Sequence, residues 1–192
     1  MTQKTTSNLR RDEIIDIASR LFYEQGYHRT GIQQIIEEVG VAKGTFYTHF
    51  KSKETLGVAW LKKHHIHFNS ILEEAIKDIQ LPDEKILGIF DFLGHSMEKK
   101  DFRGCAFLNT LAETPEGDNP LRKEIVAYKK SLSDRFQSLV QESFPDWEIN
   151  ECKNISWTIF LLYEGSLVSM QNFQELWPVE AAKKQIRTLL NK

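Results

Sequence analysis

Apolar residues along this chain recur at the three- and four-residue intervals of an α-helix, and this periodicity limits its fold more than any other feature. Alternating patterns typical of half-buried strands are scarce. The periodicity therefore predicts an all-α protein. The first apolar stripe comprises Ile14, Ile15, Ala18, Leu21 and Phe22.

The breaks between the stripes predict where helices begin and end. Gly40 closes a short helix that follows Thr30, and Leu81-Pro82-Asp83 ends a long helix that starts at Lys53 and runs to about Ile79. The remaining helices are expected near residues 43–50, 86–97, 105–112, 120–139, 150–173 and 178–190.

Composition excludes several classes of protein. The chain is 41% hydrophobic and 27% charged, as ordinary soluble proteins are. Its longest apolar run is the pentapeptide Ile159–Tyr163, whereas a membrane-spanning helix needs about 20 residues. Residues 1–8 lack the apolar stretch of a signal peptide, and two cysteines cannot form a disulfide scaffold. We therefore expect a cytoplasmic protein without a membrane partner.

The net charge of −2 hides a local contrast. Residues 1–60 carry a net charge of +1, and the rest of the chain carries −3. From Lys43 to Lys53 there are three lysines, one histidine and no acidic residue. A small basic patch on an otherwise acidic protein is typical of a nucleic-acid-binding surface.

Residues 30–53, TGIQQIIEEVGVAKGTFYTHFKSK, read as two short helices joined by a tight turn. This is the helix-turn-helix pattern, whose second helix enters the major groove of DNA. Thr30 and Gln33 predict a capping box at the start of the first helix. Phe46 and Phe50 are four residues apart and should face inward, fixing the second helix on the first.

The outward side of the second helix should carry side chains suited to DNA. Lys43 can donate to guanine, Thr45 can reach base edges, and Gly44 lets the backbone approach closely. Thr48 projects outward with them. Contacts to phosphate oxygens, which fix position but not sequence, suit the side chains of Tyr47, His49 and Lys53.

This segment closely resembles the DNA-binding region of TetR-family bacterial repressors over about residues 10–60. The resemblance implies an all-helical homodimer with a C-terminal ligand-binding domain. It also carries over Gln33, Lys43, Thr45, Tyr47, Thr48, His49 and Lys53 as DNA contacts, to which we add Thr30 and Gly44. The matching residues are Phe22, Gly26, Tyr27, Thr30, Ile35, Gly40, Val41, Lys43–Tyr47 and His49–Glu54.

The expected function follows from that resemblance. It is a transcriptional regulator, most simply a repressor released from a palindromic double-stranded operator by a small-molecule inducer or by thiol modification. No catalytic residue, metal or cofactor is expected, and activation instead of repression stays open. The expected organisation is a helix-turn-helix domain over 1–52, a connecting helix over 53–81, and a ligand-binding and dimerisation domain over 82–192.

An effector site should lie among aromatic and polar side chains of the C-terminal helices. Ordinary core packing is the alternative for each aromatic residue, because cores and pockets are both apolar. Glu164 follows a strongly apolar run, so it either has a partner inside the protein or faces solvent. The candidates are Phe107, Asn109, Tyr128, Trp157, Phe160, Tyr163 and Glu164.

Cys105 is a candidate redox sensor. It follows Arg103-Gly104 at the start of a predicted helix, where the reactive thiolate is stabilised. Residues 102–113, FRGCAFLNTLAE, resemble the Gly-Cys…Ala-Glu stretch of a TetR subgroup that includes the N-ethylmaleimide-responsive repressor, in which the matching cysteine senses electrophiles and oxidants. The alternative is a small buried hydrophobic residue, which is how we interpret Cys152.

The last two long helices are expected to pair with their copies across a twofold axis as a four-helix bundle. Small residues four apart, Gly165 and Ser169, would let a partner helix approach closely. Packing within one chain is the alternative, because it buries the same stripe. The predicted interface comprises Gly165, Ser169, Ala182, Ile186 and Leu189.

Three other interpretations have less support. His64, His65 and His67 lack further ligands at useful spacing, so a polar helix face is expected instead of a metal site. An enzyme would rely on Cys105 with a histidine or on Glu164 with another acid, but no nucleophile elbow, phosphate loop or metal-hydrolase motif is present. A helical adaptor that does not touch DNA would select no duplex from random-sequence DNA.

Overall fold

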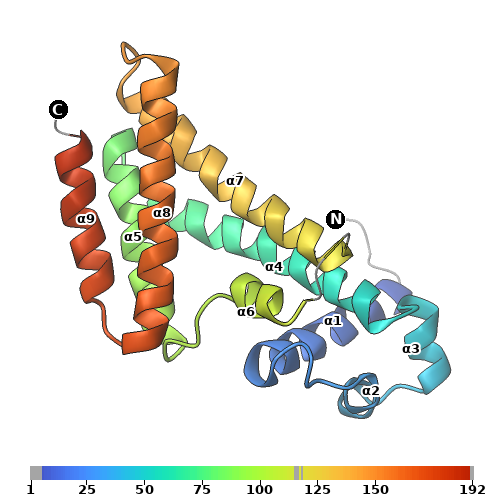
Figure 1. The fold of residues 1–192 in the computed structure, drawn as a ribbon. Helices are drawn as coiled ribbons and strands as arrows, with labels where there is room; N and C mark the ends of the chain where they lie inside the picture. The colour runs from blue at the N-terminus through green and yellow to red at the C-terminus, as the bar shows by residue number, and fades with distance from the viewer. Residues whose placement is uncertain (1–5, 115–116, 118, 191–192) are drawn as a thin grey trace. The chain divides into compact units, whose positions relative to one another are not determined.

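The computed structural model describes residues 6–114, 117 and 119–190, and within these it contains nine α-helices and no strand (Figure 1). The all-α prediction is confirmed. The helices are α1 (Thr6–Gln25), α2 (Ile32–Val39), α3 (Lys43–His49), α4 (Lys53–Ile76), α5 (Pro82–Lys99), α6 (Ala106–Ala112), α7 (Pro120–Ser143), α8 (Ile149–Phe173) and α9 (Trp177–Leu190).

The helices form two compact units. The first comprises the described residues up to 66 together with those of 106–126, and the second comprises 67–105 with 127–190. Helices α4 and α7 each contribute to both units, because the boundaries fall inside them. The short helix α6 therefore belongs to the same unit as the helix-turn-helix.

The first unit is built on the apolar stripe of α1, which is buried as predicted. Helix α1 packs against α2, whose Ile35 and Ile36 are also buried. The ring of Phe22 contacts the rings of Tyr27 and Trp60, with centroids 5.0 and 5.1 Å apart. Short helices are only marginally stable in isolation, so the burial of aromatic and aliphatic surface of this kind stabilises their packing.

The second unit packs α5, α8 and α9 side by side (Figure 1). Its centre is an aromatic cluster in which Tyr163 contacts Phe90 and Phe136, with ring centroids 5.6 and 5.9 Å apart. All three side chains are almost fully buried. No helix in the described ranges is long and apolar enough to cross a membrane.

Two local predictions are wrong. Helix α4 ends at Ile76, not near Ile79, because the amide of Ile79 bonds to the carbonyl of Ile76 in a tighter turn. The capping box is also absent, since Gly31 occupies the N-cap of α2 and no side chain caps it. Thr30 instead donates its hydroxyl to the carbonyls of Leu21 and Gly26, so packing against α1 overrides local capping.

Candidate DNA-binding surface and effector site

Helix α3 is anchored by the two phenylalanines that its spacing predicts to face inward. Phe46 is fully buried, Phe50 nearly so, and their ring centroids lie 6.1 Å apart. Seven residues are too few for an independently stable helix, so these contacts are what fix its orientation. The remaining side chains of α3 are thereby directed away from the core.

The outward face of α3 carries the predicted DNA-contacting residues. Apart from its chain neighbours and the backbone of α3 itself, no heavy atom of the described residues lies within 4 Å of the position that a Cβ would take at Gly44. The hydroxyl of Thr48 donates to the carbonyl of Gly44 at 3.0 Å. Lys43, Gly44, Thr45, Tyr47 and Thr48 are exposed, and His49 is half-buried.

Two cations beside α3 were not among the residues assigned from sequence. The guanidinium of Arg11 lies 5.2 Å from the centre of the Phe50 ring. The ammonium of Lys51 donates to the carbonyl of Tyr47 at 3.2 Å, near the C-terminus of α3. The Arg10-Arg11 pair at the start of the chain is the sequence signal that could have indicated the first of them.

The other three predicted contacts lie in different settings. Thr30 is fully buried, so we correct the prediction and remove it from the DNA-contacting set. Gln33 is exposed on α2 and donates to Glu37 at 2.9 Å. Lys53 is half-buried and donates to the carbonyl of His28 at 3.1 Å; burial lowers the pKa of its ammonium, and nearby Glu113 opposes that shift.

The predicted effector residues do not form one cluster within a single unit. Phe107 and Asn109 lie on α6 in the first unit, whereas the other five belong to the second. Trp157 is 48% exposed, with the ammonium of Lys153 4.8 Å from its ring centre. Trp157 therefore lies on the surface of α8 and is not part of the core, which was the alternative for each aromatic residue.

Tyr128 and Tyr163 lie together in the second unit. Their phenols share a hydrogen bond, and both rings are buried. Burial raises the pKa of each phenol well above its ordinary value, and nearby Cys105 and Glu164 raise both further. The thiol of Cys105 is thus in electrostatic range of two buried phenols.

Glu164 has a partner inside the protein. The ammonium of Lys129 donates to its two carboxylate oxygens at 2.6 and 2.7 Å. Only 21% of the Glu164 side chain and 16% of the Lys129 side chain are exposed. Of the two alternatives for Glu164, the structure therefore supports the partnered carboxylate.

Cys105 follows a loop with unusual backbone geometry. Asp101, Phe102 and Gly104 all have left-handed φ angles, of 50°, 51° and 88°. The side chain of Gln171 covers Gly104, and its amide donates to the carbonyl of Arg103 at 3.2 Å. Cys105 itself is partly exposed and lies just before α6, whereas Cys152 is buried.

The histidines of α4 are not a uniformly solvated face. His64 and His65 are half-buried and lie 5.3 and 6.4 Å from the ring of Phe107, while His67 is exposed. The described residues contain no group of three or more His, Cys, Asp or Glu side chains placed to hold a metal ion. The expected polar face is therefore correct for His67 alone.

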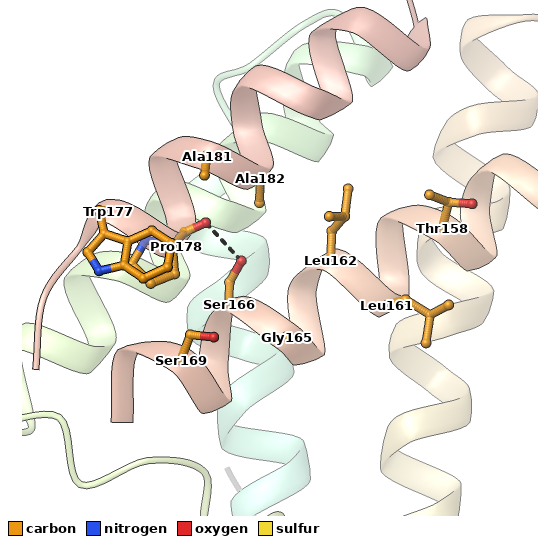
Figure 2. A pocket seen from close by; sticks show the side chains of 10 residues that line it. All are labelled: Thr158, Leu161, Leu162, Gly165, Ser166, Ser169, Trp177, Pro178, Ala181 and Ala182. Atoms are coloured by element: carbon orange, nitrogen blue, oxygen red, sulfur yellow. Dashed lines mark hydrogen bonds between the residues drawn. The ribbon is translucent and has the colours of Figure 1, made fainter. Parts of the chain in front are cut away.

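An open apolar groove of about 380 Å³ lies between α8 and α9 (Figure 2). Gly165, Ser169 and Ala182, three of the predicted interface residues, line it. Ile186 is fully buried within the chain, so we correct the prediction that it contacts a partner. The remaining lining residues, missed from sequence, are Thr158, Leu161, Leu162, Ser166, Trp177, Pro178 and Ala181.

The helix-turn-helix matches a known family. The sequence profile described as "Bacterial regulatory proteins, tetR family" matches residues 14–59, which include α2 and α3. A fatty acid metabolism regulator protein of Bacillus subtilis is 36% identical over 139 residues, which cover 72% of this chain and 70% of the relative. The chain belongs to the TetR family of DNA-binding transcriptional regulators.

Similarity to relatives also extends over almost the whole chain. The HTH-type transcriptional repressor NemR of Escherichia coli is 30% identical across 97% of this chain and 96% of its own length. The crystal structure of E. coli NemR in its reduced form has the same fold, with a TM-score of 0.79 over 94% of this chain and 96% of that one, at 18% identity in the structural alignment. The relatives of this family are transcriptional regulators and not enzymes.

Proposed function

We propose that this protein is a homodimeric repressor that leaves a palindromic operator when a small molecule binds or when Cys105 is modified. The observation that carries the proposal is the exposed face of α3, where Lys43, Thr45 and Tyr47 surround Gly44. Open space over Gly44 suits the close approach of a DNA backbone. The neighbouring cations Arg11 and Lys51 suit phosphate oxygens.

The α8–α9 groove supports the dimer. TetR-family regulators form homodimers. The lining of the groove includes the small residues Gly165 and Ala182, and two of its other residues, Leu161 and Trp177, are exposed large hydrophobic residues. A symmetric pair of such surfaces would bury this apolar area and bring two copies of α3 to a twofold-symmetric operator.

Two observations support Cys105 as the effector site. The thiol is partly exposed, and it lies in electrostatic range of Tyr128, Tyr163 and Lys100. Cysteines that react with electrophiles are typically accessible to solvent and close to a cation. NemR, which is similar to almost the whole of this chain, is described in a reduced form, and this supports a redox-dependent state in this chain as well.

DNA binding is tested first. An operator duplex is selected from random-sequence DNA, and its affinity is measured by fluorescence anisotropy for the wild type, Lys43→Ala and Tyr47→Ala. Both variants should lose operator binding and keep the wild-type helicity, whereas Lys130→Ala, an exposed lysine on α7, should bind as the wild type does. Unchanged affinity of both α3 variants would refute the assignment of α3.

Release is tested with the same duplex. Treatment with N-ethylmaleimide should weaken binding of the wild type but not of Cys105→Ser. Release of both proteins would place the reactive group elsewhere, and release of neither would direct the search to non-covalent ligands. For the dimer, Gly165→Trp should shift the mass in solution toward the monomer, while Ala127→Trp on the exposed face of α7 should not.

A further inference from the structure

Glu113 follows α6 directly and contacts the turn that joins α1 to α2. Its Oε2 accepts a hydrogen bond from the backbone N–H of His28. Its Oε1 lies 2.8 Å from the position that a Cβ would take at Gly26, where a φ of +98° already favours glycine. Any larger residue at position 26 would therefore displace the Glu113 carboxylate.

Lys53, the first residue of α4, holds the same turn through a second contact. Its ammonium donates to the carbonyl of His28 at 3.1 Å and lies 4.6 Å from the centre of the Tyr27 ring. Both backbone polar groups of His28 are therefore bonded to charged side chains. Charge-assisted hydrogen bonds are shorter and stronger than neutral ones, so this turn is fixed more firmly than a solvated turn would be.

The position of Glu113 in the chain connects this contact to the candidate sensor. Helix α6 begins one residue after Cys105 and ends one residue before Glu113. A displacement of α6 must therefore act on the carboxylate that holds the turn. The turn leads directly into α2 and α3, which carry the DNA-contacting face.

We propose that Glu113 is a positioning residue for DNA binding, which sets the Gly26–His28 turn and transmits movement of α6 to α3. This inference rests on the proposed function, because it names the residue through which the effector segment acts. Coupling between two sites is reciprocal, so DNA bound at α3 must also change the local stability of α6. That effect requires no effector.

Hydrogen exchange on the full-length protein tests the proposal. Operator DNA should slow amide exchange in α6 (Ala106–Ala112) of the wild type, as well as in α3. In Glu113→Ala, the duplex should still protect α3 but no longer α6, and operator affinity should fall about tenfold, as the loss of one charge-assisted hydrogen bond implies. Glu113→Gln keeps an acceptor for the His28 amide and should restore most of both effects.

Controls separate this role from a general loss of structure. Glu142→Ala removes an exposed carboxylate from α7 and should behave as the wild type does. If Glu113→Ala does not fold, Glu113→Asp, which retains the charge but is one methylene shorter, gives the same test. Protection of α6 by DNA that persists unchanged without Glu113 overturns the proposal.

The experiment also distinguishes failure of the proposed function from failure of this inference. If N-ethylmaleimide leaves the operator affinity of the wild type unchanged, release through Cys105 fails. The exchange of α6 with and without DNA still decides the role of Glu113, because neither measurement uses the effector.

Discussion

Replacing Phe46 with alanine should separate the folding of α3 from its contacts with DNA. Phe46 is fully buried, and removal of a buried phenylalanine costs about 3–5 kcal/mol of the free energy of unfolding. The adjacent Tyr47 is 36% exposed and makes an edge-on ring contact with Phe46 at 5.3 Å. Loss of that contact should cost about 1 kcal/mol.

The two variants should therefore both fail to bind operator DNA, for different reasons. Urea titrations followed by circular dichroism should show a large loss of stability for Phe46→Ala and a small one for Tyr47→Ala. Since whole domains are stable by only about 5–15 kcal/mol, the first loss is a large share of the total. If the free energy of unfolding of Phe46→Ala is less than about 1 kcal/mol below that of the wild type, our account of how α3 is anchored is refuted.

Three further outcomes follow from the packing. Glu164→Ala leaves the half-buried Lys129 without its partner and should lower the free energy of unfolding by about 2 kcal/mol. Adding Lys129→Met should recover part of that loss, and urea titrations in which the losses of the two single variants simply add in the double variant would contradict this. Burial raises the pKa of Tyr27 to about 12, above its unfolded value near 10, so its stabilisation is complete below pH 10 and is lost as the pH rises through 12. In Tyr27→Phe the free energy of unfolding should therefore fall less between pH 10 and 12, by no more than about 2 kcal/mol. If this variant loses as much unfolding free energy as the wild type does over that pH range, Tyr27 is not buried as described. Gly26→Ala should cost at least about 1–2 kcal/mol because of its left-handed φ, and its Cβ would also displace the Glu113 carboxylate. The loss is measured as a lower midpoint of thermal unfolding.

Periodicity and breaker residues predicted most of the helices because each depends on local chemistry. The inward orientation of Phe46 and Phe50 follows from their spacing alone, and the structure confirms it. Ser52, a serine directly before α4, has the local chemistry of an N-cap, and its hydroxyl accepts a hydrogen bond from the amide of Thr55 at 3.1 Å. These features need no knowledge of the tertiary contacts.

The errors arise where a distant contact overrides the local preference. Thr30 has the chemistry of an N-cap, yet its hydroxyl donates to the carbonyls of Leu21 in α1 and of Gly26 just after it, and the side chain is buried. Ile186 lies on the apolar stripe of α9, but packing within the chain covers it completely. Periodicity identifies a buried face without saying which surface buries it. The contact of Glu113 with His28 joins residues 85 positions apart, and no local pattern indicates it.

The compact unit that carries the helix-turn-helix is discontinuous in sequence, and this has a consequence for how the protein is made and recombined. The described residues within 106–126 supply part of that unit, including Leu121, which is buried and would meet a Cβ placed at Gly57. A nascent chain cannot complete this core until residue 126 has left the ribosome. For the same reason, fusing only the N-terminal segment through the helix-turn-helix to another regulator would not transfer the complete DNA-binding unit. A fusion that also carries residues 106–126 would preserve the core of that unit.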